Sequence, residues 1–150
     1  MFRIISRTPE QKADLEWTWE RCDEDFFAAG ACHILAGTFL EMHPAAGHHA
    51  LMLQPAEGFR GGHVVATDGT TVFDCRGWSP LAVFLHRYTE GCRAIYPGWN
   101  CTLVKVAAPL SWAFARETNC RHASQFFRDP IPRAQAFIRG FPPPAPSGPE

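Results

Sequence analysis

The sequence predicts a single α+β domain in which helices pack on an antiparallel sheet of three to five strands. Two observations carry this prediction: a pair of β-rich runs flanks Asp68-Gly69, and a third run at residues 101–106 alternates in the β manner, with helix-start signals between them. The chain has 150 residues, 46% of them hydrophobic and 19% charged, which suits one domain with a full core. The domain is expected over residues 1–141, and the proline-rich residues 142–150 are expected to form a disordered or polyproline-like tail.

Cap residues and apolar spacing mark the helices. Thr8 followed by Pro9 is a helix start, and Ser79 followed by Pro80 is another, because a hydroxyl caps the helix and proline suits its first position. The expected helices cover residues 9–21, 31–42, 80–91 and 133–139.

The strands are expected at residues 50–54, in a hairpin over 63–74, and at 101–106. Asp-Gly is the preferred sequence for a two-residue type I′ turn. A turn at Asp68-Gly69 pairs residues whose numbers add up to 137, so that His63 faces Asp74. Directly opposed residues share one face of the sheet, and the hairpin therefore predicts an imidazole beside a carboxylate.

Charge and composition exclude several classes of protein. The formal net charge is −1, which argues against nucleic acid or an anionic membrane as the main partner. No apolar run approaches the about 18–20 residues needed to cross a bilayer, and no signal peptide is visible, so a cytoplasmic location is expected. The six cysteines form no CxxC pair and are expected to be reduced. Twelve of the 14 basic residues are Arg, which hints at a bacterial gene.

Three residues have the properties of a catalytic triad. Cys32 is predicted to open a helix, where the helix dipole stabilises a thiolate and the first-turn N–H groups could bind an oxyanion. His63 could take the thiol proton and return it to a leaving group, and Asp74 could hold the imidazole ring. Taken singly, each residue is more typical of a structural role: Cys32 of a buried core residue, His63 of a core or edge-strand histidine, and Asp74 of a surface turn or strand end. Their conjunction favours catalysis.

The motifs around these residues resemble small papain-like and transglutaminase-like cysteine hydrolase domains. They are Ala31-Cys32-His33 opening a helix, Gly62–Val65, and Val72–Gly77, and the resemblance spans about residues 30–105. In that superfamily the nucleophile heads a helix packed on an antiparallel sheet, and the residues follow in the order Cys, His, Asp. The resemblance implies a papain-like core with Cys32 as nucleophile, His63 as base and Asp74 as the orienting residue.

Three further residues are candidates for substrate binding. Trp78 could wall the site or pack on the next helix, and Arg76 could hold a substrate carboxylate or pair with Asp74. Gln54 follows the nucleophile in the chain, whereas papain-like proteases carry an oxyanion-donating Gln ahead of it. The predicted function is a thiol-dependent hydrolase or acyl-transfer enzyme of the amidase, deamidase or peptidase type, which acts on an amide or ester through a Cys32 thioester. A peptide or protein amide is the expected substrate, and the departures from the family pattern argue against a typical endopeptidase.

Rival interpretations concern metals and partners. Pro44 and Gly47 lie between His43 and the adjacent residues His48 and His49, which favours a solvated loop over a metal site. No metal or cofactor is expected. Residues 101–150 mix Arg with Phe and carry a net charge of +3, which suits a protein partner better than nucleic acid. The alternative function is a non-catalytic interaction module, of the kind found in effector or toxin-related domains.

Overall fold

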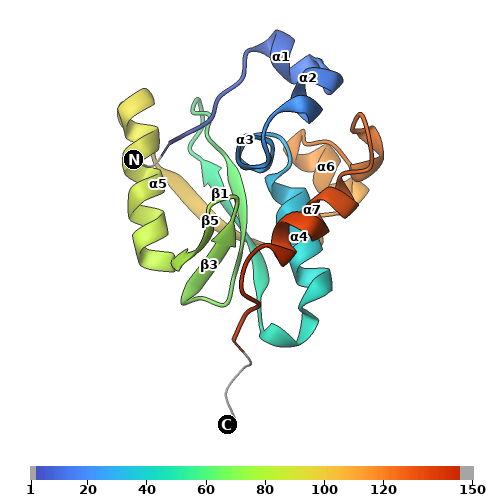
Figure 1. Ribbon diagram of the computed structural model, residues 1–150. Coiled ribbons are helices and arrows are strands. Elements are labelled where there is room, and N and C mark those ends of the chain that lie inside the picture. The colour runs from blue at the N-terminus through green and yellow to red at the C-terminus, as the bar shows by residue number, and fades with distance from the viewer. Residues whose placement is uncertain (1–2, 146–150) are drawn as a thin grey trace.

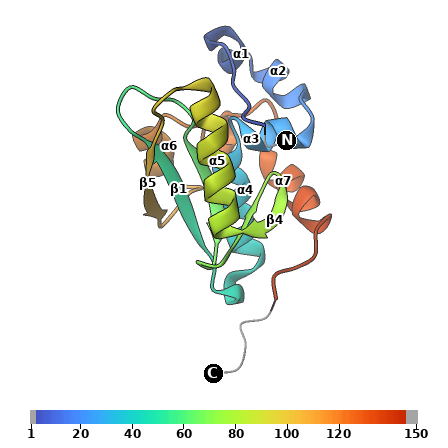
Figure 2. The same cartoon turned by 90° about the vertical axis from the view of Figure 1, so that its left-hand side faces the viewer.

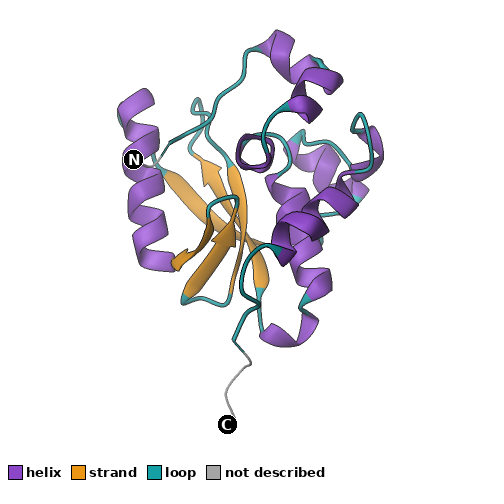
Figure 3. Ribbon diagram, viewed as in Figure 1, coloured by secondary structure: helices purple, strands orange, loops and turns teal. Residues whose placement is uncertain are grey.

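The structure is a computed structural model that describes residues 3–145 (Figure 1). Four α-helices come first in the chain, four consecutive strands follow, and the fifth strand lies between two of the later helices; Figure 3 distinguishes the helices and strands by colour. The α-helices are α1 (Pro9–Ala13), α2 (Leu15–Glu20), α3 (Asp23–Ala28), α4 (Cys32–Met42), α5 (Leu81–Ile95), α6 (Trp112–Thr118) and α7 (Pro130–Arg139). The strands are β1 (His49–Pro55), β2 (His63–Thr67), β3 (Thr71–Asp74), β4 (Gly77–Pro80) and β5 (Cys101–Val106), and two 3-10 helices span Pro44–Ala46 and Ala123–Gln125.

The five strands form one sheet in the order β4-β3-β2-β1-β5, and every neighbouring pair is antiparallel. Helix α5 covers one face of this sheet, and α4 covers the other face together with α7 (Figures 1 and 2). The α+β class and the predicted packing of helices on an antiparallel sheet are thereby confirmed. Strand β2 lies in the middle of the sheet and is buried along its whole length.

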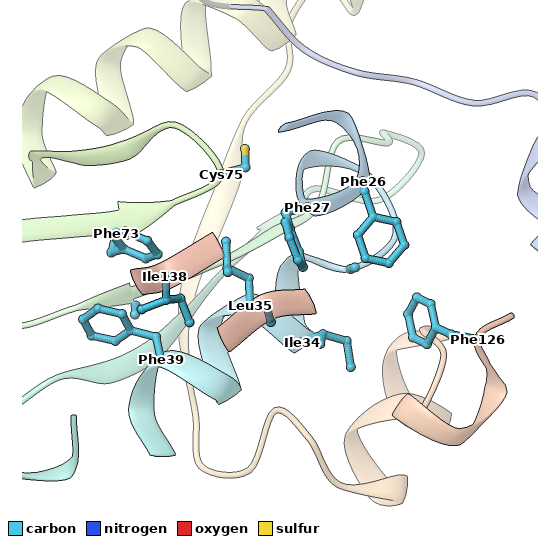
Figure 4. Packing of buried hydrophobic residues seen from close by; sticks show 12 residues of the cluster. Phe26, Phe27, Ile34, Leu35, Phe39, Phe73, Cys75, Phe126 and Ile138 are labelled. Carbon is cyan, nitrogen blue, oxygen red and sulfur yellow. The ribbon is translucent and has the colours of Figure 1, made fainter. Parts of the chain in front are cut away.

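Aromatic side chains fill the layer between α4 and the sheet (Figure 4). Phe39 of α4 stacks on Phe73 of β3, with ring centroids 5.0 Å apart and an angle of 22° between the planes. Phe26 and Phe27 of α3 pack beside them in the same cluster. These contacts fix the axis of α4, and with it the position of Cys32 at the head of this helix.

The register of the β2–β3 hairpin differs from the prediction. Thr67 pairs with Val72, so that paired residue numbers add up to 139 rather than 137. The Asp68 carboxylate accepts hydrogen bonds from the backbone N–H groups of Thr70 and Thr71, which lengthens the connection between the paired residues Thr67 and Val72. Such side-chain bonds compete with the strand ladder. A shift of two residues leaves every side chain on the predicted face of the sheet, because side chains alternate with a period of two.

Three of the four predicted helices differ at an end. The first is split at Asp14, whose side chain accepts a hydrogen bond from Trp17 N and caps α2. Ser79 and Pro80 belong to β4 instead of starting a helix, because Ser79 pairs with Val72 in the sheet. Helix α5 therefore begins at Leu81, and it runs through Gly91 to Ile95. The last helix, α7, begins at Pro130, three residues before the predicted start, with Asp129 as its cap.

The predicted proline-rich tail falls partly outside the described residues, which end at 145. Residues 142–145 are neither helix nor strand, and the carbonyl oxygen of Pro142 accepts a hydrogen bond from Trp78 Nε1. Within residues 3–145, every helix is too short or too polar to reach across a lipid bilayer.

The stacked pair of Phe39 and Phe73 allows a direct test of the packing between α4 and the sheet. Replacing Phe39 with alanine removes a side chain that is 1% exposed, and we expect the free energy of unfolding to fall by about 3–5 kcal/mol. Leu103→Ala is the control, because Leu103 lies on the edge strand β5 and is 45% exposed, and should change stability by about 0.5 kcal/mol or less. Urea denaturation measures both. Equal losses in the two variants would contradict this packing.

Candidate active site

His63 and Asp74 form a buried pair on adjacent strands. His63 Nε2 lies 3.0 Å from Asp74 Oδ2, and the two side chains are 1% and 2% exposed. The ring of His63 stacks on Tyr88 of α5 with a centroid distance of 5.3 Å and an angle of 9°. The predicted neighbourhood of imidazole and carboxylate is therefore present, although the two residues are diagonal rather than directly opposed in the observed register.

Arg76 is the second partner of this carboxylate. Its Nη1 lies 2.7 Å from Asp74 Oδ2, and its backbone N–H donates to Asp74 Oδ1 over 2.9 Å. Burial alone would raise the pKa of Asp74, but the hydrogen bond with His63 and the positive charges of His63 and Arg76 hold it below its usual range. Of the two roles predicted for Arg76, the structure shows the pairing with Asp74.

Cys32 is the first residue of α4, as predicted, and its side chain is partly exposed. The N-cap residue of this helix is Ala31, whose methyl side chain cannot accept a hydrogen bond from the first-turn N–H groups. The positive end of the helix dipole therefore acts on the thiol without competition from a cap. The backbone N–H groups of this turn are the donors that the site offers to an oxyanion.

The thiol of Cys32 and the ring of His63 shift each other's pKa. Burial opposes ionisation of the thiol, but the ring nitrogens and the positive charge of the neighbouring His33 and His63 lower the pKa of Cys32 to about 5. Burial likewise opposes protonation of His63, but Asp74 and Cys32 raise its pKa to about 9. The opposite directions of the two shifts favour a thiolate–imidazolium pair over a neutral thiol and imidazole.

The hydrogen-bond partner of His63 indicates which ring nitrogen carries the bound proton and which remains for exchange. The Asp74 carboxylate is ionised and accepts the Nε2 proton, so Nδ1 is the nitrogen left to exchange a proton with Cys32. Nδ1 is buried and has no hydrogen-bond partner among residues 3–145, so no hydrogen bond joins it to the Cys32 thiol in this structure. Catalytic hydrogen bonds are often long or poorly aligned in the absence of substrate.

His33 is a member of the site that the sequence reasoning did not assign. It is 1% exposed, and its Nε2 lies 2.6 Å from the carbonyl oxygen of Arg121. Its Nδ1 has no hydrogen-bond partner within residues 3–145 in strict geometry, and the ring helps to lower the pKa of Cys32. The only signal in the sequence is its place next to the candidate nucleophile.

The thiol of Cys75 lies close to the His63–Asp74 pair, with the potential ligand atoms of the three residues within 4.8 Å of one another. Strand β3 ends at Asp74, and the Cys75 thiol lies 3.8 Å from Asp74 Oδ2. It is 4% exposed, and its sulfur lies at the edge of the cluster in Figure 4. Burial and the charge of Asp74 raise the pKa of Cys75 well above its ordinary value, so this thiol stays protonated and unreactive.

His63, Asp74 and Cys75 are also the one group of three potential metal ligands found among residues 3–145, with ligand atoms within 4.8 Å of one another. A metal ion would need a neutral His63 and a deprotonated Cys75. The Arg76 guanidinium, whose Nη1 lies 2.7 Å from Asp74 Oδ2, would compete with a cation for this carboxylate.

A cavity of about 800 Å³ opens onto the thiol and the imidazole. It lies at the end of the sheet where β1 ends and β2 begins, and Cys32, His63, Gln54 and Arg76 line it. Trp78, the third residue predicted to bind substrate, packs instead on Phe39 and Phe73 in the core. These aromatic partners belong to α4 and β3, and Trp78 also lines a small cavity with Val83 and Phe84 of α5, the helix named in its predicted alternative.

The two remaining features predicted from the sequence are the loop with His43, His48 and His49 and the C-terminal segment rich in Arg and Phe. The His48 ring packs on Phe39 and Trp78, and its Nδ1 lies 3.1 Å from the carbonyl oxygen of Ala46. In the C-terminal Arg/Phe segment, Phe114 and Phe126 are buried, whereas Phe127 is 44% exposed. A binding role for this segment stays a prediction.

Comparison with protein-family models, with curated proteins and with solved structures finds no match to this chain. The likeness to papain-like and transglutaminase-like hydrolases therefore stays a prediction from motifs. The geometry of Cys32, His63 and Asp74 has to carry the functional argument by itself.

The lowered pKa predicts unusual reactivity for one cysteine. Cys32 should react with iodoacetamide with a pH midpoint near 5, because only the thiolate attacks, whereas exposed Cys22 should show a midpoint of about 8.5. His63→Gln should move the Cys32 midpoint upwards. Peptide mapping by mass spectrometry measures each rate in the same sample. A Cys32 midpoint matching that of Cys22 would refute the ion pair.

Proposed function

We propose that this protein is a thiol-dependent enzyme that hydrolyses or transfers an acyl group from an amide or ester through a thioester on Cys32. The observation that carries the proposal is the buried His63–Asp74 pair, whose second ring nitrogen is left for a thiol at the head of a helix. The cavity gives a substrate access to these groups. The resemblance to small papain-like hydrolase domains agrees with the same roles.

The first half of the reaction forms the thioester. The Cys32 sulfur attacks the carbonyl carbon, and the developing oxyanion accepts hydrogen bonds from the first-turn N–H groups of α4. The His63 imidazolium then gives its Nδ1 proton to the departing amine or alcohol, the bond to that group breaks, and the carbon–sulfur bond remains. Asp74 stabilises the imidazolium and keeps its ring oriented.

The second half releases the acyl group. Neutral His63 takes a proton at Nδ1 from water, and the resulting hydroxide attacks the thioester carbonyl. The carbon–sulfur bond breaks, an acid is released and the thiolate–imidazolium pair is restored. An amine in place of water would give transamidation by the same steps.

An activated ester tests the covalent step. With p-nitrophenyl acetate, the protein should release a burst of about one equivalent of nitrophenol per chain, and mass spectrometry should find the acetyl group on Cys32. Cys32→Ala should abolish the burst, and Cys22→Ala should not change it. A burst that survives Cys32→Ala, or no burst at all, would favour the non-catalytic interaction module.

The pH dependence follows from the two shifted groups. Turnover should rise as the thiolate forms near pH 5 and fall as the imidazolium loses its proton near pH 9, which gives a broad bell. The sign follows from the roles, because acylation needs Cys32 deprotonated and His63 protonated. Steady-state hydrolysis across pH 4–10 measures both limbs. A single rise near pH 8.5, as for an ordinary thiol, would contradict the mechanism.

Replacing the orienting residue should affect turnover more than folding. Asp74→Ala leaves His63 Nε2 without its acceptor and should lower the acylation rate by about 10²–10⁴-fold. Circular dichroism should show that the fold persists. Asp74→Asn keeps the side-chain volume and is the companion variant if alanine unfolds the chain. Full activity in a folded Asp74→Asn protein would remove Asp74 from the mechanism.

A further inference from the structure

The cavity in front of Cys32 has a strongly uneven charge. Its basic lining residues are Arg7, Lys12, Arg60, Arg76 and Arg121, and Glu117 is the one acidic residue that lines it. The whole chain has a formal net charge of −1, so this concentration of cations is local. A cavity lined by one sign of charge raises the local concentration of ligands of the opposite sign.

Arg7 is the most unusual of these cations. Its Nη1 is buried and has no hydrogen-bond partner among residues 3–145, and it forms no salt bridge there. By contrast, Arg76 is paired with Asp74, and Arg121 donates to the carbonyl oxygen of Lys12. A buried guanidinium N–H group without an acceptor costs free energy, which a bound carboxylate or phosphate would recover.

The backbone just before the nucleophile makes room for this guanidinium. A Cβ built on Gly30 would lie 2.9 Å from Arg7 Nη1 and 3.1 Å from Arg7 Cζ. Gly30 also has a φ of 116°, which residues with a side chain rarely adopt. Because Gly30 precedes Cys32 by two residues, the guanidinium is held beside the head of α4.

The electrostatics around Arg7 favour an anion beside its guanidinium. Burial lowers the pKa of Arg7, and the neighbouring charge of Arg121 lowers it further, while Cys32 and Cys120 act in the opposite direction. The guanidinium groups of Arg7 and Arg121, which both line the cavity, thus repel each other. A single anion between them would relieve this repulsion, and the planar donors of Arg suit either a carboxylate or a phosphate.

We infer that the substrate of the proposed acyl chemistry carries an anionic group, a carboxylate or a phosphate, which Arg7 binds with help from Arg121 beside Cys32. The inference rests on the proposed function, because it names the class of substrate for that site. Arg7 is then a specificity residue: it places an acidic acyl donor with its carbonyl at the thiolate and disfavours a neutral one.

Two alkylating reagents of nearly equal size test this inference. Iodoacetate carries a carboxylate, iodoacetamide is neutral, and in both cases a carbon–sulfur bond forms and iodide leaves. The ratio of the two rates at Cys32 cancels any change in the thiolate fraction, because both reagents react with the same thiolate. The ratio therefore reports anion binding apart from nucleophile activation.

Arg7→Gln should lower this ratio about tenfold at pH 7.5, since the local anion concentration falls. Arg139→Gln is the matched control, because Arg139 lies at the exposed end of α7 outside the cavity, and should leave the ratio unchanged. Saturable protection of Cys32 against iodoacetamide by acetate would indicate a carboxylate ligand, and protection by inorganic phosphate a phosphoryl ligand.

An unchanged ratio in Arg7→Gln, or protection by neither anion at matched ionic strength, would overturn the inference. The rate at which iodoacetamide alone labels Cys32 is a separate readout, and it tests the proposed function independently of the anionic substrate. If Cys32 is no more reactive than Cys22 toward that neutral reagent, the proposed function fails. If Cys32 is fast but indifferent to charge, only the anionic substrate is excluded.

Discussion

The buried hydrogen bond between His63 and Asp74 is the constraint on which the rest of the site depends. An ionised carboxylate that is 2% exposed is costly unless its charge is compensated, and here the imidazole and Arg76 both compensate it. This requirement fixes which nitrogen of His63 is bound and which remains for the thiol. It also joins β2 to the end of β3 at the point where the hairpin stops pairing.

The site assembles where two layers of the molecule meet. His63 faces α5 and stacks on Tyr88, whereas Cys32 begins the helix that covers the opposite face of the sheet. The two side chains can interact because His63 is the first residue of β2, at the end of the sheet rather than its middle. Each layer brings one member of the candidate site, so the proposed chemistry depends on correct packing of both helices.

Much of this arrangement was predictable from local patterns. The start of α4 at Cys32, the strand at residues 101–106 and the nearness of His63 to Asp74 all follow from caps, alternation and a turn sequence. The exact register did not follow, because the Asp68 side chain captures the backbone N–H groups of two following residues. The His63–Asp74 prediction survived since the shift was even.

The remaining errors and omissions come from tertiary structure. Ser79 resembles a helix cap, but its backbone pairs in β4, and Trp78 finds an aromatic core instead of the cavity. Arg7 lies 25 residues before Cys32 in the chain and reaches the site only because Gly30 leaves room for it. No spacing rule within a single helix or strand reveals such a contact.

The protonation state of the His63 ring tests the account most directly. Nitrogen-15 NMR of the imidazole distinguishes a neutral ring from an imidazolium and follows its titration without any substrate. The account predicts that His63 stays an imidazolium up to about pH 9, and that its pKa falls when Cys32→Ala removes the thiolate. A neutral His63 ring at pH 7 that does not respond to the loss of Cys32 would contradict it.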